Sequence, residues 1–262
     1  MFDAKKYWDD RLSQHYDLVG VGDISLGMNY NKWSYNITRK ILRRLFIKYD
    51  ALLPNNENVL DIGCGTGFVV DIWKSLSKKV TGIDISQTAI KNLKIKFPGF
   101  SFMEFDMGSG IVDLPDNKFA ICSAASVLYH IIDDNSLDMA LGNIHRVLQP
   151  DGIFIFSDNF IHNSEFNVTH QKCRTLSEYE KALMKNGFEI IDRVPNYVLM
   201  NDPVDAKTKF YPRLWNLFTR LSKKSKLIDA VIWPAIYPVE FILTSVMKES
   251  PAQEIMICKA IK

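Results

Sequence analysis

Residues 59–67 have the sequence VLDIGCGTG, an apolar run with one acid followed by three glycines at alternate positions. The apolar run predicts a buried strand, and the glycines predict a turn directly after it. A backbone without Cβ atoms lets a ligand approach closely, and a helix that starts after the turn offers unpaired N–H groups. Asp61 adds a carboxylate at the end of the strand. The strand and its turn therefore predict a ligand site.

Short apolar runs alternate with helical stretches from residue 59 onward. This alternation predicts an α/β fold, with a doubly wound parallel sheet covered by helices on both faces. Residues 150–152, Pro-Asp-Gly, are expected to end the helix before the fifth strand. The expected strands, in chain order, are NVLDIG, KVTGIDIS, FSFMEFDM, FAICSAASVLYHI, GIFIFSDNF, FEIIDRV and QEIMICKAI.

The residues at the strand ends indicate which ligand the turn would take. A dinucleotide turn favours G-x-G-x-x-G, but Phe68 stands where the third glycine would be. Asp61 would repel a pyrophosphate, whereas it would attract the sulfonium or amino group of S-adenosylmethionine. Asp84, which ends VTGID, is placed to accept both hydroxyls of an adenosine ribose. Asp106 is placed to accept from the adenine amino group, and Met107 to offer its backbone N–H.

Five segments resemble, in order and spacing, the motifs of class I S-adenosylmethionine-dependent methyltransferases: VLDIGCGTG, VTGIDIS, FMEFDM, FAICSAASVLYHI and VLQPDGIFIFSD. The resemblance covers roughly residues 50–195 and the final strand. It implies a seven-stranded sheet whose last strand is antiparallel, and S-adenosylmethionine as the methyl donor, with S-adenosylhomocysteine as product. Each residue alone fits an ordinary turn or a solvated acid equally well. The cofactor contacts expected from the resemblance are Asp61, Gly63, Gly65, Gly67, Asp84, Ile85, Asp106, Met107 and Ala125.

The segment after the fourth strand lines the acceptor site in this family. Residues 123–130, SAASVLYH, lack the Asn/Asp-Pro-Pro-aromatic signature of nucleobase enzymes and the Pro-Cys pair of cytosine-C5 enzymes. This favours a small-molecule acceptor, with hydroxyl methylation preferred and amine methylation as the alternative. His130 is the candidate catalytic base, because histidine ordinarily titrates near neutrality. The alternative is that His130 only bonds the backbone and shapes the pocket, and Tyr129 is expected to contact the acceptor.

Asp158 and Asn159 end the fifth strand, where they are expected to contact the acceptor. Catechol-type O-methyltransferases use such a pair to bind a divalent metal, together with another Asp near the fourth strand. Val127 or Leu128 stands near that place here, so the oxygen ligands are incomplete and no metal is expected. His162 and His170 are further candidates for bonding a polar acceptor, and their spacing matches no zinc pattern.

The first fifty residues are rich in Tyr, Trp and Arg. A similar segment forms a lid over the cofactor in methyltransferases of bacterial natural-product and surface-glycan pathways. By that resemblance, Tyr30 or Arg39 would hold the methionine carboxylate and Trp33 would contact the acceptor. The alternative is an amphipathic helix whose aromatic residues cover the edge of the sheet.

Residues 196–251 form an insertion before the last strand. Residues 205–229 contain seven Lys/Arg and two Asp, and the apolar stretch AVIWPAIYPVEFILTSVM follows. Pro234, Pro238 and Glu240 make this stretch too broken for a transmembrane helix. A helical lid over the pocket is expected. A compatible alternative is peripheral contact of residues 205–245 with an anionic membrane or a lipid-linked acceptor.

The composition limits the remaining possibilities. The chain is 47% apolar and 24% charged with a net charge of +2, which is ordinary for a globular protein and gives no bias toward nucleic acid. Four scattered cysteines without a C-x-x-C pair argue for a reducing compartment. No signal peptide is visible, so a cytoplasmic location is expected, peripheral to a membrane if the insertion touches one.

The expected organisation is one domain over residues 1–262. Its parts are a cap (1–50), a Rossmann-like core (51–195 and 252–262) and a lid (196–251). The expected function is methylation of a glycan, lipid-linked or secondary-metabolite intermediate. One rival is a nicotinamide-dependent oxidoreductase, which the displaced third glycine disfavours. Another is a non-catalytic cofactor-binding protein, whose donor site would be disrupted.

Overall fold

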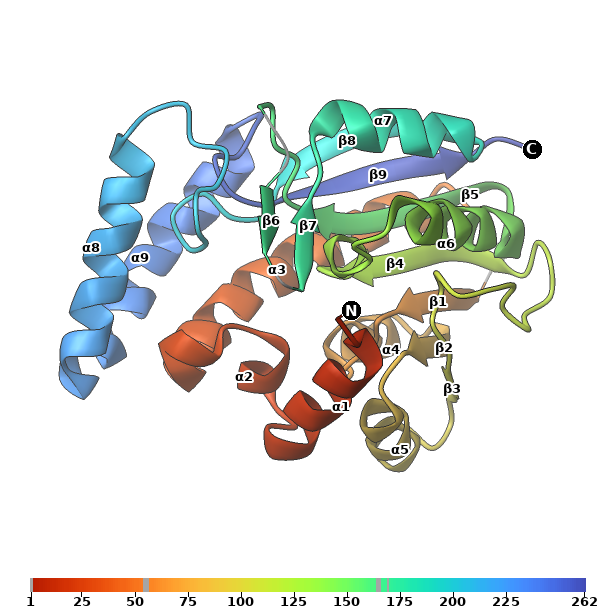
Figure 1. Cartoon of the computed structure of the whole chain (residues 1–262), viewed down its shortest axis with the longest axis horizontal. Helices are drawn as coiled ribbons and strands as arrows, with labels where there is room; N and C mark the ends of the chain where they lie inside the picture. Colours follow the sequence, from red (N-terminus) through yellow and green to blue (C-terminus); the bar gives the residue numbers. More distant parts are fainter. Residues whose placement is uncertain (1, 54–56, 164–165, 169) are drawn as a thin grey trace.

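The computed structural model describes residues 2–53, 57–163, 166–168 and 170–262, and within them seven strands form one sheet (Figure 1). Their order is β3-β2-β1-β4-β5-β9-β8. Strands β1 to β5 pair in parallel, whereas β9 is antiparallel to both of its neighbours. This confirms the predicted doubly wound sheet with an antiparallel last strand. The strands are β1 (Asn58–Ile62), β2 (Lys79–Asp84), β3 (Ser101–Glu104), β4 (Phe119–Ala125), β5 (Leu148–Asp158), β8 (Phe188–Pro195) and β9 (Glu254–Ala260).

Helices cover both faces of this sheet, because its central strands are apolar on both sides. Along β1, Val59 packs in the cluster that contains α3 and α4, whereas Leu60 packs with α6 and α7. All four cysteines are buried and form no disulfide. The helices of the core are α3 (Gly27–Asp50), α4 (Phe68–Ser75), α5 (Gln87–Lys96), α6 (Asp134–Val147) and α7 (Leu176–Lys185).

A stacked aromatic pair joins α3 to α4. The rings of Phe46 and Trp73 lie 3.6 Å apart between centroids at an interplanar angle of 7°, and both side chains are fully buried. The Trp73 Nε1 atom also donates a hydrogen bond of 3.1 Å to the Ser123 hydroxyl on β4. The pair therefore fixes the long N-terminal helix on the sheet.

The start of β5 differs from the sequence prediction. Helix α6 ends at Val147 and β5 begins at Leu148, so Pro150 to Gly152 lie inside the strand and do not end the helix. The pairing of β5 with β4 shifts register here, and Asp151 has a φ of 61°. A proline lacks the N–H that a regular ladder needs, so it is tolerated where the ladder is interrupted.

The N-terminal cap consists of α1 (Ala4–Gln14), α2 (Leu18–Val21), the 3-10 turn η1 (Ile24–Leu26) and the start of α3. Asp9 on α1 accepts hydrogen bonds from the Ser86 hydroxyl (2.6 Å) and the Thr88 amide (3.0 Å). These bonds hold α1 at the N-terminus of α5, beside the carboxyl end of β2. The cap thus covers the edge of the sheet where ligands are expected.

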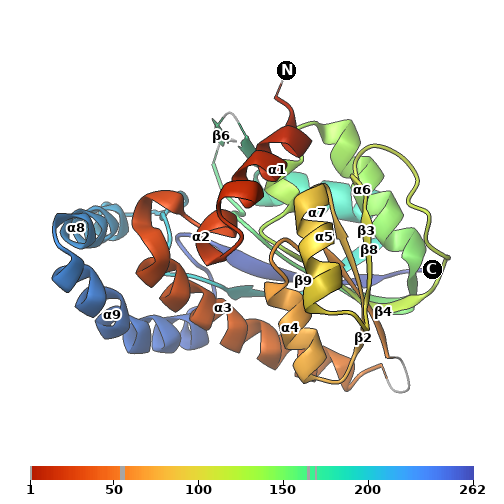
Figure 2. The same ribbon diagram turned by 90° about the horizontal axis from the view of Figure 1, so that it is seen from below.

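The insertion forms a helical hairpin of α8 (Phe210–Lys224) and α9 (Lys226–Val246), and α9 lies alongside α3 (Figure 2). Helix α9 runs without a break through Pro234 and Pro238, so the expectation of a broken segment was wrong. By length and composition it is the one helix in the described part of the chain that could cross a membrane, a property that core helices can share.

A buried carboxylate holds α9 against the core. Glu240 is fully buried and accepts hydrogen bonds from the amides of Val198 (2.7 Å), Leu199 (2.8 Å) and Met200 (3.4 Å). These three donors precede the hairpin and lie directly after β8. Because several amides share the buried charge, α9 is fixed to the segment that leaves the sheet.

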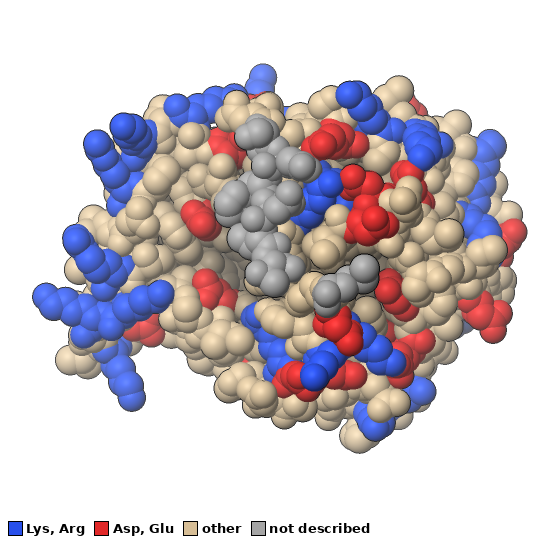
Figure 3. Space-filling view, in the orientation of Figure 1, with Lys and Arg blue, Asp and Glu red and all other residues tan. Residues whose placement is uncertain are grey.

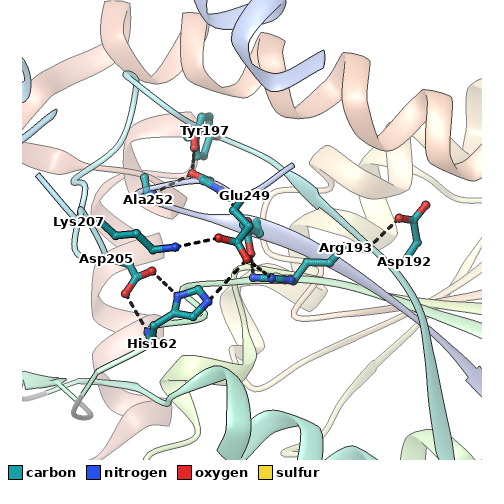
Figure 4. Close-up of polar contacts among 10 residues, drawn as sticks. His162, Asp192, Arg193, Tyr197, Asp205, Lys207, Glu249 and Ala252 are labelled. Atoms are coloured by element: carbon teal, nitrogen blue, oxygen red, sulfur yellow. Dashed lines mark hydrogen bonds and ion pairs between the residues drawn. The ribbon is translucent and has the colours of Figure 1, made fainter. Parts of the chain in front are cut away.

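A polar network ties the start and the end of the insertion to the sheet (Figure 4). Asp205 accepts from the backbone amide of His162 (2.8 Å) and contacts its ring Nδ1 (2.6 Å). Glu249 contacts Arg193 on β8 and Lys207, both at 3.1 Å. His162 does not line the cavity described below, so it anchors the insertion and does not bond the acceptor as proposed from sequence.

Replacing Phe46 by Ala tests the packing of α3. Removing a fully buried ring should lower the free energy of unfolding by about 3–5 kcal/mol, as measured by urea denaturation. Ile47→Ala, at the next position on α3 but with the side chain 49% exposed, is the control and should cost about 0.5 kcal/mol or less. Equal losses in the two variants would contradict the stacked pair as the anchor of α3.

Candidate active site

The glycine turn after β1 lies at the carboxyl edge of the sheet, as predicted. Gly63, Gly65 and Gly67 have φ angles of 64°, 48° and 82°, a region that favours glycine. A Cβ atom on Gly67 would also lie 2.7 Å from the side chains of Leu93 and Phe97 on and after α5. Gly67 therefore permits close helix packing, and it does not line the cavity beside the turn, contrary to its predicted cofactor contact.

A cavity of about 1520 Å³ lies between the glycine turn, the ends of β2 and β4, and the N-terminal cap. Most of the residues predicted from sequence line it together. These are Tyr30, Asp61, Gly63, Gly65, Asp84, Ile85, Asp106, Met107, Ala125, Tyr129, His130 and Asn159. Trp33, Gly67 and Asp158 were predicted to contact the donor or the acceptor, but they do not line the cavity.

Asp61 presents a buried carboxylate oxygen with no partner in the described part of the chain. Its side chain is 1% exposed, and Oδ1 accepts from the Ser123 hydroxyl at 2.8 Å, whereas Oδ2 accepts no hydrogen bond there. Burial, with a smaller contribution from the charge of Asp84, raises the pKa of Asp61 to about 8, although the Ser123 bond opposes this. An unpaired buried oxygen costs free energy, so the site favours a ligand that brings a donor or a cation.

Asp84 fixes the glycine turn to β2. Its two oxygens accept from the backbone amides of Gly65 (2.7 Å) and Ser86 (2.8 Å). Burial raises the pKa of Asp84 to about 6, against the lowering effect of these two bonds. A carboxylate oxygen accepts more than one hydrogen bond, so both atoms retain capacity for ligand hydroxyls.

The loop after β3 carries Asp106 and Met107, and sequence reasoning missed the residue that shapes it. Asn143 on α6 is buried, donates to the carbonyls of Met107 (3.0 Å) and Gly110 (2.6 Å), and accepts from the Val112 amide (3.1 Å). Asp106 is exposed, at the cavity margin. The signal for Asn143 was a polar residue on the buried face of an amphipathic helix.

Arg11 is a second residue whose role the sequence did not show: it holds the cap against the glycine turn. Its guanidinium donates to the carbonyls of Gly20 (2.5 Å) and Gly22 and so holds α2 in place. The Tyr35 hydroxyl donates to the Val21 carbonyl at 3.0 Å. The Val21 side chain lies 3.0 Å from where a Cβ on Gly65 would be. The cap therefore contacts the turn directly.

The cap residues predicted to hold the donor, and Trp33, predicted to contact the acceptor, have other partners. Tyr30 lines the cavity, but its hydroxyl donates to the Met200 carbonyl at 2.9 Å. Arg39 pairs with Asp71 at 3.0 Å and does not line the cavity. Trp33 packs edge to face on Tyr237 of α9, with centroids 5.0 Å apart. The structure thus assigns Trp33 and Arg39 to packing and to a surface ion pair.

His130 lies among aromatic rings on the opposite side of the cavity. Its Nδ1 atom is 2.9 Å from the His170 carbonyl, which only accepts, so Nδ1 carries the proton and Nε2 keeps its lone pair. Burial lowers the pKa of His130 to about 4, so the ring is neutral at pH 7. Trp8 of the cap packs edge to face on it at 4.9 Å, and Tyr129 lies at 4.4 Å.

Asn159 adds a second unpartnered oxygen on this side. Its Oδ1 atom is buried without a partner among the described residues, and it lines the cavity. Asp158 is fully buried and accepts from the Tyr179 hydroxyl (2.5 Å) and the Asn159 amide (2.7 Å). It therefore orders the core at the end of β5, and it does not line the cavity in which the acceptor was expected to contact it. Within the described residues, no group of three His, Cys, Asp or Glu side chains is arranged to hold a metal ion.

The comparisons with known proteins agree with this geometry. Residues 60–156 match the family model for a methyltransferase domain. An uncharacterized methyltransferase of Oceanobacillus iheyensis is 28% identical over 128 residues, which cover 47% of this chain and 58% of that protein. A malonyl-[acyl-carrier protein] O-methyltransferase of Serratia marcescens is 31% identical over 101 residues, 38% of each protein. The chain thus spans less than two thirds of the length of these curated relatives.

A solved structure shares the fold over most of its length. It is described as an S-adenosylmethionine-dependent methyltransferase from Methanosarcina mazei and superposes with a TM-score of 0.55 at 16% identity, over 83% of this chain and 97% of that one. The matched segment, residues 60–156, runs from β1 to β5 and carries the glycine turn and the loop after β3. Residues 60–156 thus match a methyltransferase domain, and the fold of the chain is that of the class I S-adenosylmethionine-dependent methyltransferases.

Proposed function

We propose that the protein transfers the methyl group of S-adenosylmethionine to a hydroxyl of a small molecule. The observation that carries the proposal is the buried, unpartnered Oδ2 of Asp61, a residue that lines the cavity beside the glycine turn. The proposed setting is a glycan, lipid-linked or secondary-metabolite pathway, as the sequence suggested. Methylation of an amine is the alternative.

The residues on the donor side fit S-adenosylmethionine. Asp61 would accept from its ammonium group, and Asp84 from its ribose hydroxyls. The turn at Gly65 leaves the backbone open, and the loop held by Asn143 would receive the adenine. Bound there, S-adenosylmethionine supplies a methyl group already activated on a sulfonium centre. The protein then has to orient the acceptor and exclude water.

The side of the cavity where the methyl acceptor would bind presents hydrogen-bond acceptors. Nε2 of His130 has a lone pair, and Oδ1 of Asn159 has no partner in the described chain. Both atoms suit a methyl acceptor that donates hydrogen bonds, and a hydroxyl group is such a donor. His130 would take the proton of that hydroxyl as its oxygen attacks. The aromatic rings of Trp8 and Tyr129 would cover an apolar or flat part of the acceptor. The Serratia marcescens relative is itself an O-methyltransferase.

The same site disfavours the nicotinamide rival. A dinucleotide places its pyrophosphate at the glycine turn, and there Asp61 and Asp84 supply two buried carboxyl groups. Neither is paired with a Lys or Arg side chain in the described structure. Phosphate oxygens would face these acids without a compensating cation, whereas a ligand with an ammonium and a sulfonium would not.

Replacing Asp61 by Asn tests the donor site. The amide keeps the Ser123 bond but removes the acceptor for an ammonium group, so the Kd for S-adenosylmethionine should rise about 10- to 100-fold by calorimetry. Asp71→Asn, an exposed acid outside the cavity, should leave the Kd unchanged. Tight NAD binding without S-adenosylmethionine binding would overturn the proposed function, and an unchanged Kd in Asp61→Asn would remove Asp61 from the site.

The affinity for S-adenosylmethionine should rise with pH between about 6 and 7.5, the range in which an α-amino group stays charged. Burial raises the pKa of Asp61 to about 8, so the free protein holds a proton that binding must release. Because the folded pKa exceeds that of the unfolded chain, this group's contribution to stability is lost as pH rises toward 8. Calorimetry in two buffers of different ionisation enthalpy measures the release, and Asp61→Asn should abolish it.

Replacing His130 by Asn separates its two roles, because the Asn amide can still donate to the His170 carbonyl but lacks the Nε2 lone pair. If His130 is the base, turnover should fall about 10²- to 10⁴-fold. Deuterium-labelled methyl donor, incubated with small-molecule extract and followed by mass spectrometry, identifies the acceptor and gives the rate. A fall of less than about threefold would leave His130 a structural role only.

A further inference from the structure

Helix α9 exposes an apolar stripe along its whole length. The side chains repeat at intervals of three or four residues, so they share one face of the helix. The exposed fractions include 80% for Leu227, 65% for Val231, 59% for Ile242 and 69% for Val246. The members of the stripe are Leu227, Val231, Ala235, Val239, Ile242 and Val246. A helix of this length presents about 30 Å of apolar surface.

Basic residues surround this stripe. Residues 207–228 contain seven Lys/Arg and no acid. Lys226 and Lys248 are exposed at the two ends of α9. Lys40 of α3 flanks its middle, with Nζ 4.9 Å from the Tyr237 ring centroid. Figure 3 shows Lys and Arg side chains gathered over α8, the other helix of the hairpin. The apolar stripe thus has a positive margin on α3, at both of its ends and over the hairpin.

The acids of this region all have partners within the protein. Asp229 accepts from the Ser222 hydroxyl (2.6 Å) and the Trp233 indole (3.0 Å). Glu240 is bound by three backbone amides, and Glu249 pairs with Arg193 and Lys207. Glu240 is thus buried and Glu249 is already paired, so the six Lys/Arg of residues 209–226 outnumber the one negative charge, that of Asp229, left in this region.

We propose that the α8–α9 hairpin docks the protein on the surface of an anionic lipid bilayer, with the α9 stripe in the interface and the flanking Lys and Arg on lipid phosphates. An amphipathic helix binds such a surface through apolar area plus electrostatic attraction, and α9 with its margin supplies both. The positive margin is what selects an anionic bilayer over a neutral one or a second copy of the chain.

The structure opposes insertion of α9 across the bilayer. Insertion would break the hydrogen bonds that Glu240 accepts from three backbone amides. It would also separate the fully buried Trp233 from the ring of Tyr30, whose centroid lies 4.8 Å from that of Trp233. A buried carboxylate is also costly at the centre of a bilayer. Docking on the surface leaves these contacts intact, because the stripe is on the opposite face of α9.

Flotation with vesicles tests the proposal without any methyl acceptor. The full chain should float with phosphatidylcholine vesicles containing about one third phosphatidylglycerol, but not with pure phosphatidylcholine, and NaCl at about 0.5 M should release it. Leu227→Gln/Val231→Gln/Ile242→Gln should weaken binding at least tenfold. Lys223→Gln/Lys224→Gln/Lys226→Gln should weaken it about 100-fold.

Matched controls lie on α5 and α7. Ile95→Gln replaces an isoleucine that is 81% exposed, and Lys91→Gln/Lys94→Gln/Lys181→Gln removes the same charge from exposed positions. Both should bind as the unmodified protein does, and circular dichroism verifies that every variant is folded.

Four results would overturn the proposal. They are no binding to anionic vesicles, equal binding to neutral ones, equal loss in the control variants, and retention in the membrane after alkaline carbonate. Dimerisation that the stripe variants abolish, without vesicle binding, would assign the stripe to a second copy of the chain. Because flotation needs no S-adenosylmethionine, its failure is distinct from a failure of the proposed methyl transfer.

Discussion

The indole of Trp73 connects the packing of the core to the chemistry of the site. One of its faces stacks on Phe46 of α3, and its N–H fixes the Ser123 hydroxyl, which in turn donates to Asp61. The Asp61 carboxyl is thereby held beside the cavity, with one oxygen satisfied and the other without a partner in the described part of the chain. A buried carboxylate without such support would be costly and poorly oriented. The order of α3, α4, β4 and β1 thus decides where the donor-side oxygen points.

The parts of the site that sequence predicts are those set by the sheet itself. In a parallel sheet the residues after each strand meet at one edge, so Asp61, Asp84, Met107 and His130 lie around one cavity as expected. The parts it missed depend on tertiary contacts between distant segments. Asn143 is a polar residue on the buried face of α6, but its own segment does not show that its partners are the carbonyls of Met107 and Gly110. Asp158 was expected to contact the acceptor, but the Tyr179 hydroxyl holds it in the core.

The insertion shows the same limit of local reasoning. Pro234 and Pro238 indicate a helix break, because each lacks an N–H and crowds the preceding turn. Helix α9 nevertheless continues through both, since packing on α3 and the bonds to Glu240 stabilise it. Helix propensity is a weak preference that tertiary contacts override. The cap and the hairpin, far apart in sequence, meet at Tyr30, whose ring contacts Trp233.

The position of β9 has a consequence for synthesis of the protein. Residues 254–260 form the strand between β5 and β8, both made earlier on the ribosome. Until residue 260 emerges, β5 and β8 lack their shared neighbour, and each presents unpaired N–H and C=O groups along one edge. From the synthesis of β8 until that of β9, the nascent chain therefore carries open edges on both strands. Such edges are prone to mispairing, so this half of the sheet can pair correctly only after β9, the last of its seven strands in chain order, has been made.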